Sequence, residues 1–173
     1  ELPKLKNQTV GFRSFLKTSA YSKLTFEYHH LQEFRRGGDL LNRPPHEANI
    51  AEQLRHSINS GGLKFDYFSP DEKHRLSVYA SAQHIGRDSY YGGNQDLNAY
   101  GATKDFTWVA GSQYIYHFDR CLFMPSDLTG GVEYNQDNLK DDMWGYNRYT
   151  NQKVRIAGAF FQNEWRNRQW SIL

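Results

Sequence analysis

The sequence predicts an all-β fold built as an antiparallel up-and-down meander. Leu63, Phe65 and Tyr67 alternate with charged residues, so apolar and polar side chains fall on opposite faces of one strand. Pro70 and the charged residues around it then interrupt the pattern, as a tight turn does, before alternation resumes. Strands with one apolar and one polar face recur along the chain, so the hairpin at residues 63–93 is the unit on which the prediction rests.

The composition agrees with thin, two-faced strands. Only 38% of the 173 residues are hydrophobic, too few for a thick core, yet 16% are aromatic. The length indicates one domain or a piece of one. A net charge of +2 is too small to indicate a nucleic-acid partner. The sequence has no secretory signal at Glu1 and no run of roughly 18 apolar residues for a transmembrane helix, but a membrane β-barrel needs only alternation.

Two strands are predicted before the central hairpin, at residues 9–17 and 23–36. Residues 1–8 are polar and without periodicity. The apolar face of the second strand ends at His29 and His30. This strand therefore leaves an apolar environment part of the way along its length.

Residues 44–56 fit two interpretations. Ile50, Leu54 and Ile58 have the spacing of a helix, with Pro45 in its first turn. The same three residues also share the parity of an extended strand. We favour the strand, because the preceding strand needs a partner of comparable length.

The remaining strands follow the hairpin. They are predicted at residues 106–119, 128–135 and 153–165, with a further strand beginning at 169. Residues 94–104 and 136–152 are predicted to be polar loops, and residues 120–126 a longer turn that contains Pro125.

Short turns and long loops alternate along the predicted meander. Short turns fall near Thr18, Ser69, Arg120 and Asn167, and long loops after Gly37, Gly92 and Gln136. All short connections therefore lie at one end of the sheet and all long ones at the other. That arrangement is typical of outer-membrane barrels, so we predict eight strands of a barrel of roughly twenty.

The predicted meander has two open edges, which can be relieved by curling into a small closed barrel or by copies that pair edge to edge or stack their apolar faces. An isolated segment is expected to curl into a small closed barrel with its aromatic face inward, because closure removes both unpaired edges. A segment of an intact larger barrel is expected to be a gently curved open arc.

Two stretches resemble a known family. Residues 22–38 (Ser-Lys-Leu-Thr-Phe-Glu-Tyr-His-His-Leu-Gln-Glu-Phe-Arg-Arg-Gly-Gly) and residues 160–165 (Phe-Phe-Gln-Asn-Glu-Trp) resemble the barrel of TonB-dependent outer-membrane receptors, closest to the ferric siderophore and colicin receptor type. The second is similar to a strand of that family that ends in a Gln-Asp-Glu-Trp-like motif before a short periplasmic turn. The resemblance implies that residues 1–173 are a fragment of the receptor's β-barrel domain, without the plug domain and the remaining strands.

The resemblance also implies a function. The expected activity is import of a scarce small-molecule ligand (a ferric siderophore, haem or cobalamin) across the outer membrane of a Gram-negative bacterium. The expected partners are outer-membrane lipid and the TonB system, which acts through the plug domain. No enzymatic activity and no cofactor are expected. The alternative is a soluble β-barrel or sandwich that binds a small molecule or carbohydrate, in which Leu24, Val78 and Trp108 face an internal core instead of lipid.

The candidate ligand-binding residues lie in or next to the predicted long loops. They are Arg35, Arg36, Tyr90, Tyr91, Trp144 and Tyr146. Tyrosine and tryptophan offer rigid contact area with a polar tip, guanidinium groups suit anionic ligands, and loops on a rigid scaffold commonly bind. The alternative interpretation of the same rings is an interfacial aromatic belt with packing inside the loops.

Metal ligands and catalytic groups are not indicated. His29 and His30 point to opposite faces of a strand and cannot share a metal ion. The oxygen-rich cluster of Asp137, Asp141 and Asp142 has no EF-hand spacing, so we expect a solvated acidic loop rather than a calcium site.

No catalytic pair emerges from the carboxylates or the cysteine. Nothing brings Glu133 and Glu164 together as glycoside hydrolysis would require. The single cysteine, Cys121, excludes an internal disulfide and lies in an apolar segment.

Overall fold

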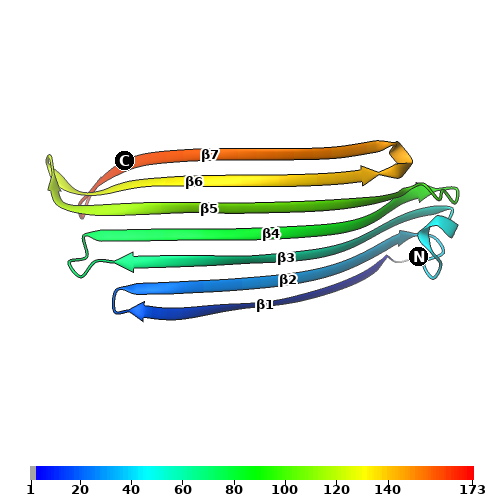
Figure 1. Ribbon diagram of the computed structural model, residues 1–173, viewed down its shortest axis with the longest axis horizontal. Helices are drawn as coiled ribbons and strands as arrows, with labels where there is room; N and C mark the ends of the chain where they lie inside the picture. Colours follow the sequence, from blue (N-terminus) through cyan, green and yellow to red (C-terminus); the bar gives the residue numbers. More distant parts are fainter. Residues whose placement is uncertain (1–2) are drawn as a thin grey trace.

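The computed structural model, described here for residues 3–173, is a single antiparallel β-sheet (Figure 1). Its eight strands lie in space in the same order as in the sequence, which confirms the predicted up-and-down meander. The strands are β1 (Lys4–Ser19), β2 (Ser22–Gly38), β3 (Ile50–Phe68), β4 (His74–Gly93), β5 (Tyr100–Cys121), β6 (Met124–Met143), β7 (Arg148–Arg166) and β8 (Ser171–Ile172). Two short 3-10 helices, η1 (Pro45–Glu47) and η2 (Trp144–Tyr146), lie in the connections.

The strands are longer than the sequence predicted. β1 already begins at Lys4, β5 begins at Tyr100, and β6 and β7 fill most of the predicted loop at residues 136–152. Both loop predictions were therefore wrong in extent. These strand ends carry mostly polar residues on both faces, so apolar and polar residues no longer alternate there. The backbone pairing of β6 with β7 nevertheless continues, from Asn138 with Lys153 to Met143 with Arg148.

The segment at residues 44–56, whose sequence fits either a helix or a strand, contains both a short helix and the start of a strand. η1 has Pro45 in its first turn, and the strand prediction is confirmed from Ile50 onward. The predicted turn at residues 120–126 is shorter than expected. Only Leu122 and Phe123 separate β5 from β6, and Leu122 adopts a positive φ of 63°.

The connections differ in length between the two ends of the sheet, but less than predicted. At one end they are residues 20–21, 69–73, 122–123 and 167–170. At the other end, which carries η1 and η2, they are residues 39–49, 94–99 and 144–147. Only the β2–β3 connection is long. We call these the short-turn end and the long-connection end; they lie at the left and right of Figure 1.

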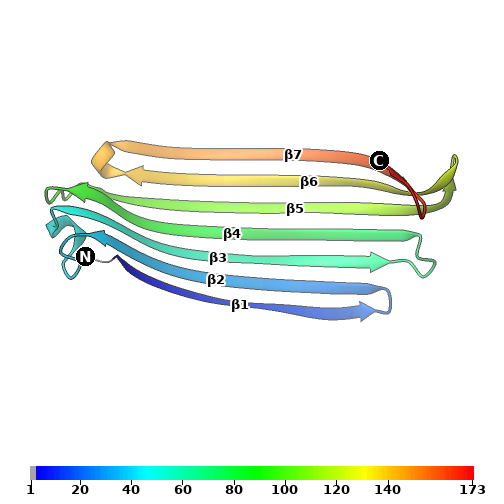
Figure 2. The same ribbon diagram turned by 180° about the vertical axis from the view of Figure 1, so that it is seen from behind.

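The sheet is open. β1 pairs only with β2 and β8 only with β7 among the described residues, and both views show one layer of strands side by side (Figures 1 and 2). The small closed barrel expected for an isolated segment is therefore wrong, and the open form expected for part of a larger barrel is observed. Closure would have to pair the 16 residues of β1 with the two residues of β8, which cannot satisfy that edge.

The register confirms the predicted facing. Across β3 and β4 the partners are Leu63 with Ala80, Phe65 with Val78, and Tyr67 with Leu76. Directly paired residues share a face, so these six residues lie together. We name this side of the sheet the Val78 face and the opposite side the Tyr79 face.

Exposed apolar residues on the Val78 face are concentrated in a band in the half nearer the short-turn end. Aromatic residues mark its two margins, with Tyr67, Tyr114 and Tyr116 on the short-turn side and Tyr28, Trp108 and Tyr134 on the other. From Tyr116 to Trp108 the distance along β5 is roughly 26 Å at about 3.3 Å per residue. Inside the band the side chains are uncovered; Val78 is 44% exposed and Phe26 41% exposed.

The only cluster of buried apolar residues found in the described part of the chain lies at the long-connection end. It contains Ala48, Ala51, Tyr90 and Ala99, with Tyr100 packed against it. The segment between β2 and β3 supplies Ala48 and is held to the sheet where His46 Nδ1 and the Tyr100 hydroxyl lie 2.7 Å apart. This core anchors the connection; it does not cover the apolar band.

Candidate functional site

The Tyr79 face carries polar and charged side chains along its whole height, with apolar residues such as Ile156 and Phe160 among them. At the level of the apolar band, the Tyr79 ring crosses β5 over Gly111, and its hydroxyl donates a hydrogen bond to Glu133 Oε2 at 2.5 Å. A side chain on Gly111 would collide with that ring, which explains the glycine. Ion pairs such as Lys64 with Asp66 at 2.9 Å occur on the same face. A surface rich in polar and charged side chains therefore lies directly behind the apolar band.

Toward the long-connection end, four strands share one hydrogen-bonded network on the Tyr79 face. Thr103 Oγ1 on β5 donates to Asp141 Oδ1 on β6 at 2.6 Å, and Arg87 on β4 donates to Thr103 Oγ1 through both Nη2 (2.8 Å) and Nε (3.1 Å). Arg148 Nη2 on β7 donates to the other carboxylate oxygen of Asp141 at 2.9 Å. Two guanidinium groups thus converge on one carboxylate.

The environment of Asp141 favours its charged form. The Thr103 hydrogen bond lowers the pKa of this carboxyl below its ordinary value, burial opposes that shift, and the Arg148 hydrogen bond adds to it. The side chain of Asp141 is only 11% exposed, whereas that of Arg148 is 60% exposed. The outer part of the network can therefore still meet an anionic ligand.

A second charged cluster on the same face joins β2 and β3. Glu33 binds Arg35 Nε at 2.8 Å and lies 3.6 Å from His56 Nδ1, while Asn7 donates to it from β1 at 3.3 Å. The hydrogen bond from Arg35 lowers the pKa of Glu33. In the register His56 lies opposite Arg87, so the two clusters are neighbours across β3 and β4.

Two of the predicted ligand-binding residues are buried on the Val78 face. Tyr90 has no exposed surface, and its hydroxyl donates to the Asp96 carbonyl at 3.0 Å. Arg36 is 2% exposed and donates to the carbonyls of Gly37 and Asp39. Both side chains hold the long-connection end together, so a ligand reaches them only if that end opens.

The other four predicted residues are accessible but do not converge. Arg35 and Tyr91 lie on the Tyr79 face, on β2 and β4 with β3 between them. Trp144 and Tyr146 lie in η2, 49% and 68% exposed. Five surface hollows in the described part of the chain are lined by other residues. Ligand contact at these positions stays a prediction.

The network around Asp141 was missed. The sequence prediction placed Thr103 and Asp141 in loops, which removed the cross-strand register that brings them together. Strand parity was the available signal, because Arg87, Thr103 and Asp141 are polar residues of one face once the strands are extended.

The structure separates the other candidate groups. His29 pairs with Gly11 and His30 with Val10, which puts the two imidazoles on opposite faces. Glu164 lies opposite Asp127 on β6, six residues from Glu133, or roughly 20 Å along the strand. Within residues 3–173, no group of three histidine, cysteine or acidic side chains is placed to hold a metal ion.

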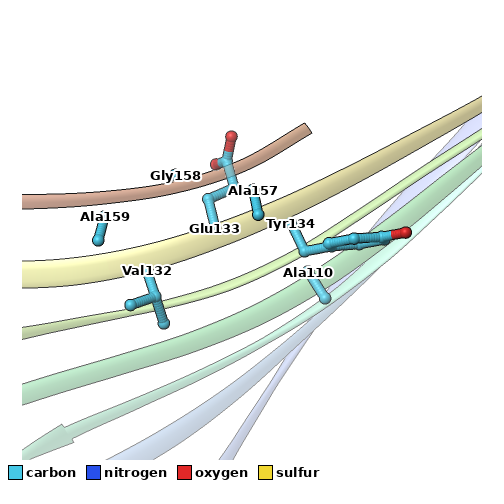
Figure 3. A pocket seen from close by; sticks show the side chains of 7 residues that line it. All are labelled: Ala110, Val132, Glu133, Tyr134, Ala157, Gly158 and Ala159. Atoms are coloured by element: carbon cyan, nitrogen blue, oxygen red, sulfur yellow. The ribbon is translucent and has the colours of Figure 1, made fainter. Parts of the chain in front are cut away.

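A shallow hollow of about 440 Å³ lies on the apolar band between β5 and β7 (Figure 3). Its floor is formed by small side chains, Ala110, Ala157 and Ala159, while Val132 and Tyr134 stand beside them. Glu133 points to the other side of the sheet. The hollow offers mainly apolar surface, as a surface against lipid tails or another apolar body would.

The two faces define a one-layer wall with an apolar band on one side and charged networks on the other. Comparison with known proteins agrees at the level of the fold. The chain is similar to the solved structure of the copper transporter OprC, with a TM-score of 0.63 and 14% sequence identity. The match covers 95% of this chain and 28% of that chain, so the chain spans less than a third of OprC. No family model and no curated protein sequence matches.

Proposed function

We propose that the chain is a segment of the wall of an outer-membrane β-barrel that imports a scarce ligand. The observation that carries this proposal is the apolar band, whose aromatic margins lie roughly 26 Å apart along β5. Transmembrane barrels carry an outward apolar band between aromatic girdles and a polar interior, and a tilted transmembrane β-strand needs about 9–11 residues to cross it, close to the nine residues from Trp108 to Tyr116. The Val78 face is then the lipid-facing surface and the Tyr79 face lines the lumen.

The long-connection end is the extracellular end in this proposal, because barrels of this class have short periplasmic turns and longer extracellular loops. The charged networks around Asp141 and Glu33 then line the external half of the lumen. Arg35, Arg87 and Arg148 suit an anionic ligand such as a ferric siderophore or haem. Cobalamin, or a copper complex as the name of OprC suggests, is a further candidate. Import is driven by the TonB system through a plug domain.

The alternative, a soluble barrel or sandwich, requires the apolar residues to be covered. In the described residues nothing covers Val78, Leu63 or Phe26. No helix in this part of the chain has the length and apolar character needed to cross a membrane. The uncovered band therefore favours the lipid-facing arrangement over an internal core.

Site-directed spin labels distinguish the two arrangements. The complete protein is reconstituted in vesicles with a label at Val78 or, as the matched control, at Gln113; Val78 pairs with Ser112, and Gln113 follows Ser112 on the opposite face. A label at Val78 should be accessible to oxygen, which concentrates in lipid, and one at Gln113 to a polar relaxation agent. A label at Val78 that neither reagent reaches would indicate a buried soluble core.

Ligand uptake tests the transport proposal. Replacing Tyr91, Trp144 and Tyr146 together with alanine should weaken uptake of the bound ligand, because Trp144 and Tyr146 are exposed and Tyr91 is half-buried at the external end. Deleting TonB should abolish uptake in the unmodified protein. Uptake that persists without TonB would show a passive pore instead.

A further inference from the structure

Above the apolar band, the Val78 face of β5, β6 and β7 carries a cluster of positive charge. Lys104, Lys140 and Lys153 are exposed and line one hollow of about 350 Å³ with His84, Asn138 and Asn151. Lys104 and Lys140 are direct cross-strand partners, and Lys153 pairs with Asn138 in the next row. We call these three lysines the lysine cluster.

The lysine cluster is not neutralised by the protein. None of its ammonium groups forms an ion pair or hydrogen bond within residues 3–173. The nearest carboxylates on this face belong to Asp88 and Asp142. Both pair with Ala102, which lies two residues from Lys104 toward the long-connection end. Like charges directly opposite each other on a sheet are destabilising, so Lys104 and Lys140 favour a bound anion between them.

The opposite face of the same strands is different. There Asp141 is bound by Arg87 and Arg148, and Asp105 accepts a hydrogen bond from Thr107. The acidic residues of β5 and β6 thus point mainly to the Tyr79 face, while the lysines point to the Val78 face. On β5, β6 and β7, this separation leaves lysines without an acidic partner on the Val78 face but not on the Tyr79 face.

The height of the lysine cluster identifies its occupant. Lys153 lies one row beyond Trp108, the aromatic margin, and Lys104 lies two rows beyond it, roughly 7 and 13 Å along the strands. The headgroup layer begins at this margin and is about 5–8 Å thick for ordinary phospholipids, more for a glycolipid. Lysine side chains reach along the surface toward such a layer.

We propose that the lysine cluster binds the phosphate groups of an anionic glycolipid headgroup in the outer leaflet. The ammonium groups neutralise phosphate, and the amide of Asn151 can hydrogen-bond to sugar hydroxyls. The site faces away from the lumen, so it is distinct from the ligand route. The inference rests on the proposed membrane placement.

The test measures lipid binding by the complete protein in detergent micelles, with diphosphoryl lipid A as the probe. Replacing the lysine cluster with glutamine should weaken binding roughly 100-fold, and replacing it with arginine should preserve binding. The matched control replaces Lys17, Lys23 and Lys64 with glutamine. These residues carry the same charge but lie on the Tyr79 face, so binding should be unchanged.

Further arms separate the possible results. Dephosphorylated lipid A should bind weakly to the unmodified protein, and inorganic phosphate at the same concentration should not displace the lipid. Equal losses in the two glutamine triples would show general charge attraction, and full displacement by inorganic phosphate would show a free-anion site; either result overturns the inference. A protein that does not enter micelles refutes the membrane placement itself, whereas one that enters them and binds lipid A without the lysine cluster refutes only this site.

Discussion

Arginine at Val78 tests the lipid-facing placement of the apolar band directly. Val78 pairs with Ser112, which lies four residues from both Trp108 and Tyr116 on β5, roughly 13 Å from each margin. Val78 is therefore at the middle of the band. Arginine on the lipid face of a barrel costs about 2–4 kcal/mol at the bilayer midplane and about 0–1 kcal/mol near the interface.

Two control substitutions fix face and depth. Gln113→Arg lies at the same depth on the Tyr79 face, where water accepts the charge, and should change stability by about 0.5 kcal/mol or less. Gln136→Arg lies on the Val78 face but beside Trp108, at the margin, and should cost about 0–1 kcal/mol. The assay is reversible denaturant unfolding of the complete protein in phospholipid vesicles.

The pattern of three values decides between interpretations. We expect Val78→Arg to be the most destabilising by at least about 1 kcal/mol. If Gln113→Arg costs as much as Val78→Arg, the two faces have been assigned wrongly. If Gln136→Arg also costs as much, the effect is independent of depth, as in an ordinary protein core.

Three further predictions concern Asp141, Tyr90 and Glu133. Asp141→Asn should destabilise the protein by about 1.5–3 kcal/mol. Because the folded pKa of Asp141 is lowered, this stabilisation is present above the unfolded pKa of about 3.9 and is lost as the pH falls through the folded pKa. In an acid titration, the difference in stability between the Asp141→Asn variant and the unmodified protein should therefore shrink below about pH 4. A constant difference would contradict the prediction. Tyr90→Ala removes a fully buried ring and should accelerate hydrogen exchange in residues 39–49, and unchanged exchange there would show that Tyr90 does not anchor the connection. Glu133→Gln still accepts the Tyr79 hydrogen bond and should leave ligand uptake nearly intact; abolished uptake would give Glu133 a role in transport.

The sequence predicted the fold wherever a strand separates two different environments. In the apolar band one face of each strand is apolar and the other is mostly polar. Apolar and polar residues therefore alternate, which identifies the strand and even its register, as at Phe65 and Val78. Beyond the band both faces meet water. Alternation then disappears, and residues 94–104 and 136–152 look like loops although much of each belongs to a backbone ladder.

The candidate site was less predictable because it depends on pairing between distant residues. Arg35 and Arg36 are chemically alike, yet one joins the Glu33 cluster on the Tyr79 face and the other is buried on the Val78 face. Parity predicts that they separate. It does not predict the burial of Arg36 or Tyr90, which requires the segment at residues 39–49 to fold against the sheet.

The length of the strands beyond the apolar band has a mechanical consequence. β5 continues from Trp108 to Tyr100, roughly 26 Å farther, and the β4–β5 and β6–β7 connections at that height span only residues 94–99 and 144–147. In the proposed barrel, this part of the rim consists of paired strands with short connections, so it is expected to be stiff rather than mobile. A ligand that enters the proposed barrel along this arc therefore passes paired strands and short connections rather than long loops.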